Sequence, residues 1–417
     1  MKKIFYLAIP ALLALAACSQ DSVVEVKEGN AISFAPVASK SLRTAENHTT
    51  NSLTEFKTSA YSKTSSKTSA FFENEKVSKE GGAWKTTQTY FWPTDGDLTF
   101  YSYAPLDFTK SQATVEMTSA DQQIKDFKVP YESKDQQDPI YAVNADEKLA
   151  DHLTAPVAVN FRHATSRILF KAKNTNPNLK IEIAGVRIAY IKGQGTFAFP
   201  KETTHNHLDT DTHFVTENDD TWGKWTLVDD SHTYTKANTE YYANQRGKGN
   251  FLTLEGASDE AQLISTDEKS WLQVLPQEVT GWDPVTDPRN DKKGAYFLVQ
   301  CYIYQKTKAS DGTESWKQMF AGRISKFSYP AETAIPFNAH WRQGTTYVYT
   351  FVFGDGAGWF PPQPTDPIED PKDPRVNEPK HPDPNKGVPV LTPVNFTVTV
   401  DEYQTDADND HLIDMKP

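Results

Sequence analysis

Short runs in which apolar and polar residues alternate recur along this chain, and they restrict its fold more than any other feature. Gly, Pro, Asn and Asp bound these runs, whereas apolar residues at helical spacing are hard to find. The clearest run is 347–353, where every second residue is Tyr or Phe, so one face of an extended strand would be aromatic. The pattern predicts an all-β chain built from β-sandwiches, with 347–353 as a central strand. Further strands are expected at 98–104, 168–172, 181–190 and 297–304.

Composition agrees with a sheet protein and excludes one class of partner. Aromatic residues make up 12% of the 417 residues, and aromatic rings fit the half-buried surface of a sheet. The formal net charge of −12 opposes binding to nucleic acid, whose phosphates attract basic surfaces. A chain of this length suggests two domains.

The N-terminus has the features of an export signal. Lys2 and Lys3 precede an apolar run of 14 residues, from Ile4 to Ala17, which is shorter than the roughly 20 residues that span a bilayer as a helix. Residues 1–17 are therefore predicted to be a signal peptide. The end of the run, Leu-Ala-Ala-Cys at 15–18, resembles a bacterial lipobox, which implies cleavage before Cys18 and attachment of lipid to it. An ordinary signal peptide that is cut elsewhere is the alternative.

Motifs that would indicate chemistry are missing from the sequence. It contains no Gly-x-Ser-x-Gly, no His-Glu-x-x-His and no phosphate-binding loop, so no enzyme activity, catalytic residue or cofactor is predicted. His205 and His207 could share one strand face, but no Cys or carboxylate cluster nearby would complete a metal site. His163 is expected to be structural. With Cys18 assigned to lipid, Cys301 has no partner for an intramolecular disulfide and is expected to be a buried thiol in a strand.

Three stretches differ in composition from the predicted strands. Residues 44–69 are dominated by Ser, Thr, Asn and Lys, so much of this stretch should be loop or mobile edge. Residues 361–393 hold 11 prolines in 33 positions and should form a semi-rigid linker. The acidic tail, 404–417, is similar to half of a calcium loop but lacks its glycine and its closing glutamate, so no metal is predicted there.

A strictly alternating strand follows the proline-rich stretch. Its apolar face would carry Val394, Phe396, Val398 and Val400, with Asn and Thr on the other face. Burial of such side chains stabilises by roughly 1.5–3 kcal/mol each. We therefore expect this segment, 394–403, to dock against a sheet, either in its own domain or in a neighbouring molecule.

A second short strand is predicted near the N-terminus, with Ile32 and Phe34 on one face. Arg43 follows it in a polar stretch and is the first arginine of the chain, and the next is Arg162, so 118 consecutive residues lack arginine. An arginine-specific protease would therefore meet one exposed site and then a domain that it cannot cut. A chance preference for lysine is the alternative.

Several patches, in this order and spacing, resemble the fimbrillin family of Bacteroidales, the major and accessory subunits of type V pili. The patches cover most of the mature chain. They are AISF at 31–34, LRTA at 42–45, YFWP at 90–93, LTFYSYAP at 98–105, NFRHATSRI at 160–168, LPQ at 275–277 and WRQGTTYVY at 341–349.

The resemblance implies two tandem transthyretin-like β-sandwich domains, which we place at 44–150 and 151–360. It further implies an outer-membrane lipoprotein, held through Cys18 and exposed on the cell surface. In the family, cleavage after an arginine removes the first strand, and a strand of the next subunit fills the groove. Transferred to this chain, the cut would fall between Arg43 and Thr44, and the segment 18–43 would leave with Ile32 and Phe34.

The candidate donor strand, 394–403, would then replace the departed strand with its residues Val394, Phe396, Val398 and Val400. The partners implied are other pilin subunits, the outer membrane and an arginine-specific protease. Stalk, tip and anchor roles stay open, since the tail continues beyond the donor strand and the proline tract is long. The alternative function is a stand-alone surface lipoprotein that binds a glycan or a host protein through exposed Trp and Tyr rings.

Overall fold

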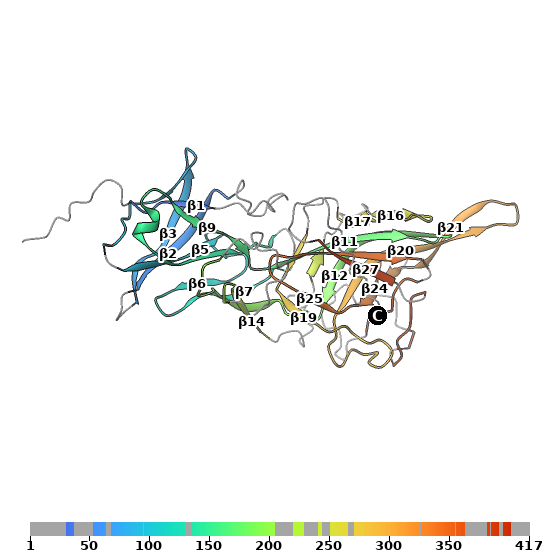
Figure 1. The fold of residues 1–417 in the computed structure, drawn as a ribbon. Coiled ribbons are helices and arrows are strands. Elements are labelled where there is room, and N and C mark those ends of the chain that lie inside the picture. The colour runs from blue at the N-terminus through green and yellow to red at the C-terminus, as the bar shows by residue number, and fades with distance from the viewer. Residues whose placement is uncertain are drawn as a thin grey trace, which may run out of the picture.

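The structure is a computed structural model that describes most of the chain. The described residues are 31–36, 53–63, 68–94, 96–130, 135–204, 220–228, 241–243, 251–265, 271–324, 327–354, 356–362, 382–383, 385–391 and 395–401. They form strands and a short 3-10 helix, η2 (Leu149–His152), so the predicted all-β fold is confirmed. Figure 1 shows the sheets following one another along an elongated molecule. In this part of the chain, no helix is long and apolar enough to cross a membrane.

An eight-stranded sheet lies at one end of the molecule, in the order β10-β8-β5-β2-β3-β4-β1-β9. Its core is a cluster of rings and aliphatic side chains from several strands, including Phe34, Phe56 and Phe100. The strands are β1 (Phe34–Pro36), β2 (Glu55–Lys63), β3 (Thr68–Glu80), β4 (Ala83–Thr86), β5 (Asp97–Ala104), β8 (Ile140–Glu147), β9 (Val157–Val159) and β10 (Arg162–His163).

The expectation that much of 44–69 is loop is wrong for 55–63. This segment is β2, which pairs with β3 on one side and β5 on the other. Phe56 and Thr58 are fully buried, and the Thr58 hydroxyl accepts a hydrogen bond from Ser102 Oγ at 3.0 Å. Polar residues can lie inside a sheet when partners on other strands satisfy them.

A four-stranded sheet in the order β14-β13-β7-β6 stands beside the first. Its strands are β6 (Thr114–Met117), β7 (Gln122–Lys128), β13 (Gln194–Ala198) and β14 (Lys224–Leu227). Strands that follow residue 150 therefore pair with strands that precede it, in this sheet and in the eight-stranded one. The division into 44–150 and 151–360 stays a prediction.

Two further sheets build the other end of the molecule. One has the order β17-β11-β26-β27, with β18 also on β11, and the other has the order β15-β12-β20-β21, with β16 on β12 and β24 on β20. The first contains β11 (Ser166–Asn174), β17 (Gln262–Leu263), β18 (Leu272–Val274), β26 (Thr346–Phe353) and β27 (Asn395–Asp401). The second contains β12 (Leu179–Ala189), β15 (Tyr241–Ala243), β16 (Leu252–Glu255), β20 (Tyr296–Lys308), β21 (Glu314–Phe320) and β24 (Ala331–Pro336). Two-stranded ladders join β19 (Gln277–Val279) to β25 (Ala339–Trp341), and β22 (Gly322–Ile324) to β23 (Phe327–Tyr329).

Aromatic rings fill the space between these two sheets. Phe297 of β20 lies 4.8 Å from Tyr349 and 5.6 Å from Phe351, both on β26, measured between ring centroids. Tyr347, Tyr349, Phe351 and Phe353 are all buried, as the alternation in 347–353 predicts. Cys301 is also fully buried, in β20 opposite Ile183.

A buried polar group joins the two ends of the molecule. The Asp138 carboxylate accepts hydrogen bonds from Arg167 of β11 at 2.7 Å and contacts His163 of β10 at 2.8 Å. Asp138 and Arg167 are 4% and 2% exposed, and the Arg167 guanidinium stacks 4.4 Å from the centre of the Trp271 ring. Since β10 belongs to the eight-stranded sheet and β11 to the sheet that contains β26, this contact ties the two sheets together. His163 has the structural place that the sequence predicts.

Candidate functional site

The first candidate element is β1, which lies inside the eight-stranded sheet. Phe34 pairs with Trp84 of β4 on one side, in antiparallel orientation, and with Val157 of β9 on the other, in parallel orientation. Backbone bonds before the strand continue the pairing, from Ile32 N to Tyr90 O at 2.8 Å and from Val157 N to Ser33 O at 2.8 Å. β1 therefore has a hydrogen-bonded neighbour on each side.

The side chains of Ile32 and Phe34 point into the core, as predicted. They are 7% and 4% exposed. The Phe34 ring packs edge-on against Phe56 at 6.1 Å and Phe100 at 5.5 Å. Removal of this strand would uncover a groove whose floor is aromatic and whose two walls are the open edges of β4 and β9.

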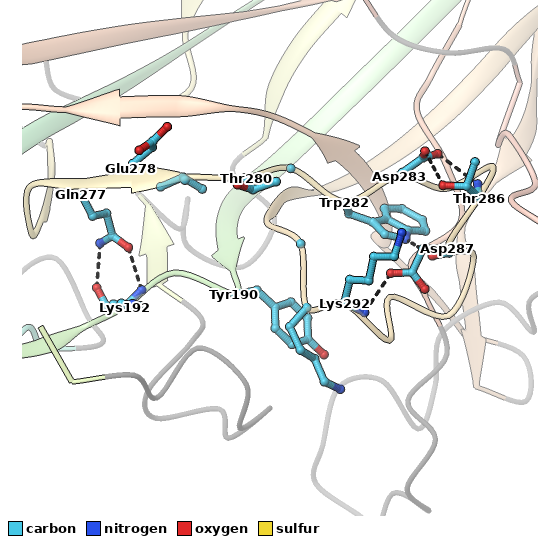
Figure 2. Close-up of a pocket in the computed structure, with 14 residues that line it drawn as sticks. Tyr190, Lys192, Gln277, Glu278, Thr280, Trp282, Asp283, Thr286, Asp287 and Lys292 are labelled. Atoms are coloured by element: carbon cyan, nitrogen blue, oxygen red, sulfur yellow. Dashed lines mark hydrogen bonds between the residues drawn. The ribbon is translucent and has the colours of Figure 1, made fainter.

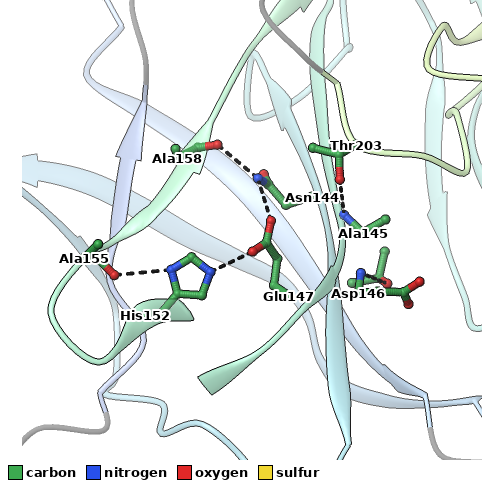
Figure 3. Close-up of polar contacts among 9 residues, drawn as sticks. Asn144, Ala145, Asp146, Glu147, His152, Ala155, Ala158 and Thr203 are labelled. Atoms are coloured by element: carbon green, nitrogen blue, oxygen red, sulfur yellow. Dashed lines mark hydrogen bonds and ion pairs between the residues drawn. The ribbon is translucent and has the colours of Figure 1, made fainter. Parts of the chain in front are cut away.

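The β9 wall is held in place by contacts that do not involve β1. Figure 3 shows Asn144 of β8, whose side-chain amide donates to Ala158 O of β9 at 3.0 Å and to Glu147 Oε1 at 3.2 Å. The His152 ring of η2 lies between Glu147 Oε2 at 2.6 Å and Ala155 O at 3.2 Å. Among the described strands, β9 has its only ladder with β1, so the bond from Asn144 to Ala158 O is a link between β8 and β9 that does not depend on β1.

The second candidate element is β27, which docks in its own molecule. It runs antiparallel to β26, with Val398 opposite Tyr349 and Val400 opposite Tyr347. Val398 is 6% exposed and Val400 packs on the same core, whereas Thr397 is exposed. The predicted alternation is therefore observed at these positions. The backbone of Phe396 pairs with Phe351, and Val394 lies outside the described residues.

Residues 385–391, which we call the strap, pack on the domain immediately before β27. Phe360 N donates to Val388 O at 2.9 Å, and Val390 N donates to Gly358 O at 2.8 Å. The Asn385 side chain accepts a bond from Arg289 at 2.9 Å. This part of the proline-rich tract is thus attached to the domain, and the linker prediction remains untested for 363–381, which lie outside the described residues.

Other predicted positions fall outside the described residues. They are the signal peptide, Cys18, Arg43, Thr44, His205, His207 and the tail 404–417. Within the described ranges, no group of three or more His, Cys, Asp or Glu side chains could hold a metal ion.

A cleft of about 390 Å³ opens beside β19 (Figure 2). Gln277 holds the backbone of Lys192 by reciprocal bonds of 2.8 and 2.9 Å. The Asp283 and Asp287 carboxylates accept bonds from neighbouring backbone amides. Tyr190 and Trp282 line the cleft but are 8% and 3% exposed. The cleft therefore offers no open aromatic surface.

The tryptophans do not form an exposed platform elsewhere either. All nine are described, and each is buried or only partly exposed: Trp84, Trp92, Trp222, Trp225, Trp271, Trp282, Trp316, Trp341 and Trp359. Recognition of a glycan by stacked, solvent-facing tryptophans finds no support in this arrangement.

Solved structures with a similar fold include proteins described as fimbrial. A crystallised fimbrial protein from Bacteroides vulgatus ATCC 8482 is 16% identical, with a TM-score of 0.50 over 78% of this chain and 95% of that one. The tip fimbrial protein Mfa3 from Porphyromonas gingivalis, solved with a C-terminal truncation, is 9% identical, with a TM-score of 0.33 over 72% of this chain and 89% of that one. At 16% identity, the first likeness shows the fold alone.

Sequence comparison gives the family directly. No curated protein sequence matches the chain. The model of the fimbrillin-like family matches residues 43–361, which is most of the chain. This protein therefore belongs to the fimbrillin-like family.

Proposed function

We propose that the chain is a structural subunit of a cell-surface fimbria that functions in adhesion. It is exported as an outer-membrane lipoprotein through Cys18, and an arginine-specific protease cuts between Arg43 and Thr44. The segment that carries β1 then leaves, and the donor strand of another subunit takes its place. Membership of the fimbrillin-like family supports the subunit role, and the two terminal strands support the mode of assembly.

The observation that carries this proposal is the difference between the surroundings of β1 and β27. In its own molecule, β27 has one described neighbour, β26. In the place of β1 it would have two, β4 and β9. Each ladder hydrogen bond formed in the groove contributes a net of about 0.5–1.5 kcal/mol, and these bonds oppose the entropy lost on association. Once β1 has gone, an incoming strand can therefore be held on both sides.

The strap sets how far the donor strand can travel. While 385–391 stay docked, only 392–394 connect the strap to β27, and three residues extend over roughly 10 Å. If the strap is released, the tract 361–393 could extend to on the order of 100 Å in polyproline II geometry. Donation to another subunit therefore requires release of both β27 and the strap.

The test is to place a charge on the buried face of the donor strand. Val398→Asp should abolish fibre growth, because a carboxylate cannot enter the apolar groove without losing its hydration. Thr397→Asp is the matched control, since Thr397 lies on the exposed face of the same strand, and it should leave fibre growth intact. Fibre length is measured by electron microscopy, and the secreted monomer by immunoblot. Fibres of normal length in the Val398→Asp variant would refute donor-strand exchange.

A further inference from the structure

One wall of the cleft beside β19 is the loop 282–294, which is held in its shape by its own hydrogen bonds. Trp282 Nε1 donates to Asp287 O at 2.6 Å. The Asn290 side chain accepts from Gly294 N at 2.6 Å and donates to Gly294 O at 2.9 Å. These bonds fix the wall of the cleft from within the loop.

The carboxylates of the loop are engaged by its own backbone. Asp283 and Asp287 each accept hydrogen bonds from two backbone amides, at 2.9–3.1 Å. The third carboxylate that lines the cleft, Glu278, is exposed and points away from Tyr190 in Figure 2. Asp283 and Asp287 therefore have a structural role in the loop.

Lys292 and Lys293 line the same cleft and bring two positive charges to it. Among the described residues, neither ammonium group forms an ion pair with a carboxylate. Lys293 Nζ lies 5.7 Å from the centre of the Tyr190 ring. Lys293 and Tyr190 both have left-handed backbone, with φ of +58° and +60°, which is rare for side chains of this size. Strained conformations of this kind concentrate at functional sites, where the surrounding structure holds them in place.

The size and lining of the cleft indicate the kind of ligand. Its volume of about 390 Å³ lies in the range of sites for small molecules. Glu278 and Thr280 line it and are exposed, so they can form hydrogen bonds with hydroxyl groups. Two ammonium groups, each with three N–H donors, suit a carboxylate. We infer that the cleft binds an acidic sugar of a surface glycan, with the carboxylate of the sugar on Lys292 and Lys293.

This inference rests on the adhesive role in the proposed function and names its ligand class. It does not depend on strand exchange, because no residue of β1, β4, β9 or β27 lines the cleft. Binding of a sugar can therefore be measured on the monomer, and fibre growth can be measured separately.

Titration of the monomeric chain, without protease treatment, tests the site. Glucuronic acid and N-acetylneuraminic acid are the probes, glucose is the neutral control, and inorganic sulfate is the anion without a sugar ring. We expect the acids to bind in calorimetry and glucose and sulfate to bind much more weakly. The Lys292→Gln, Lys293→Gln double variant should lose affinity by roughly tenfold or more, since it loses charge-assisted hydrogen bonds. Lys292→Arg should retain binding, and Lys317→Gln, an exposed lysine of β21 outside the cleft, should bind as wild type.

The outcomes separate this inference from the proposed function. Failure of both acids to bind, or equal affinity for glucuronic acid and glucose, would overturn the site. Sulfate bound as tightly as the acids would show an anion site without recognition of a sugar, and unchanged affinity in the double variant would remove the two lysines from it. A chain that grows normal fibres but binds no acidic sugar would overturn this inference alone, whereas a chain that binds the sugar but never forms fibres after processing would overturn assembly by strand exchange alone.

Discussion

Asp138→Ala should lower the free energy of unfolding by about 3–5 kcal/mol, because removal of one partner from a buried ion pair leaves the other charge buried without it. Asp138 accepts from Arg167 at 2.7 Å, and both side chains are at most 4% exposed. Since the pair joins the eight-stranded sheet to the sheet of β26, we also expect the two ends of the molecule to unfold less cooperatively in the variant. Urea unfolding, followed by tryptophan fluorescence and by far-ultraviolet circular dichroism, measures both effects.

Asp121→Ala is the matched control for this experiment. Asp121 is exposed and lies immediately before β7, and substitutions of this kind usually change the stability by no more than about 0.5 kcal/mol. Equal unfolding midpoints for the Asp138 and Asp121 variants would show that the buried pair does not hold the two ends together.

Phe56→Ala should be similarly destabilising, with a loss of about 3–5 kcal/mol from the free energy of unfolding, since truncation of a buried ring leaves a cavity. The Phe56 ring is fully buried and lies 5.4 Å from Trp84 and 5.2 Å from Phe161. It also forms part of the groove floor beneath Phe34. We therefore expect the variant to be a poor acceptor of a donor strand even at temperatures where it stays folded.

Phe91→Ala is the control variant, because it also removes a phenylalanine ring. Phe91 is 37% exposed, so its truncation should lower the stability by much less. The two variants are compared by thermal unfolding, and their acceptor activity by incorporation into fibres grown from wild-type protein. If Phe56→Ala protein is incorporated as readily as Phe91→Ala protein, the aromatic floor has no part in strand capture.

Regular alternation made the central strands predictable from the sequence. In β26 all the aromatic residues are buried, with Tyr349 and Phe351 against Phe297 of β20, and the period of two follows from strand geometry alone. β2 escaped prediction because small polar residues occupy some of its buried positions and interrupt the apolar alternation. Thr58 and Ser59 are fully buried, and their partners, Ser102 and Asn74, belong to other strands. Pairings over such sequence distances are not visible in a local pattern.

The candidate site was predictable in part for the same reason. The apolar faces of both terminal strands follow from their alternation, and Ile32, Phe34 and Val398 are buried as expected. The groove wall was not predicted, because Asn144, Glu147 and His152 meet only when β8 and η2 fold against β9. The docking of the strap was not predicted, because a proline-rich composition indicates a linker. In the structure, its backbone forms hydrogen bonds with the backbone of 358–360.

Locking β27 in its own sheet tests the central claim most directly. Thr350 and Thr397 are cross-strand partners on β26 and β27, so a Thr350→Cys, Thr397→Cys variant should form a disulfide within one molecule. After processing by the arginine-specific protease, we expect the oxidised variant to remain monomeric in light scattering and the reduced variant to polymerise, while a variant with either substitution alone polymerises under both conditions. Polymerisation of the oxidised, locked protein at the rate of the reduced protein would contradict assembly by donation of β27.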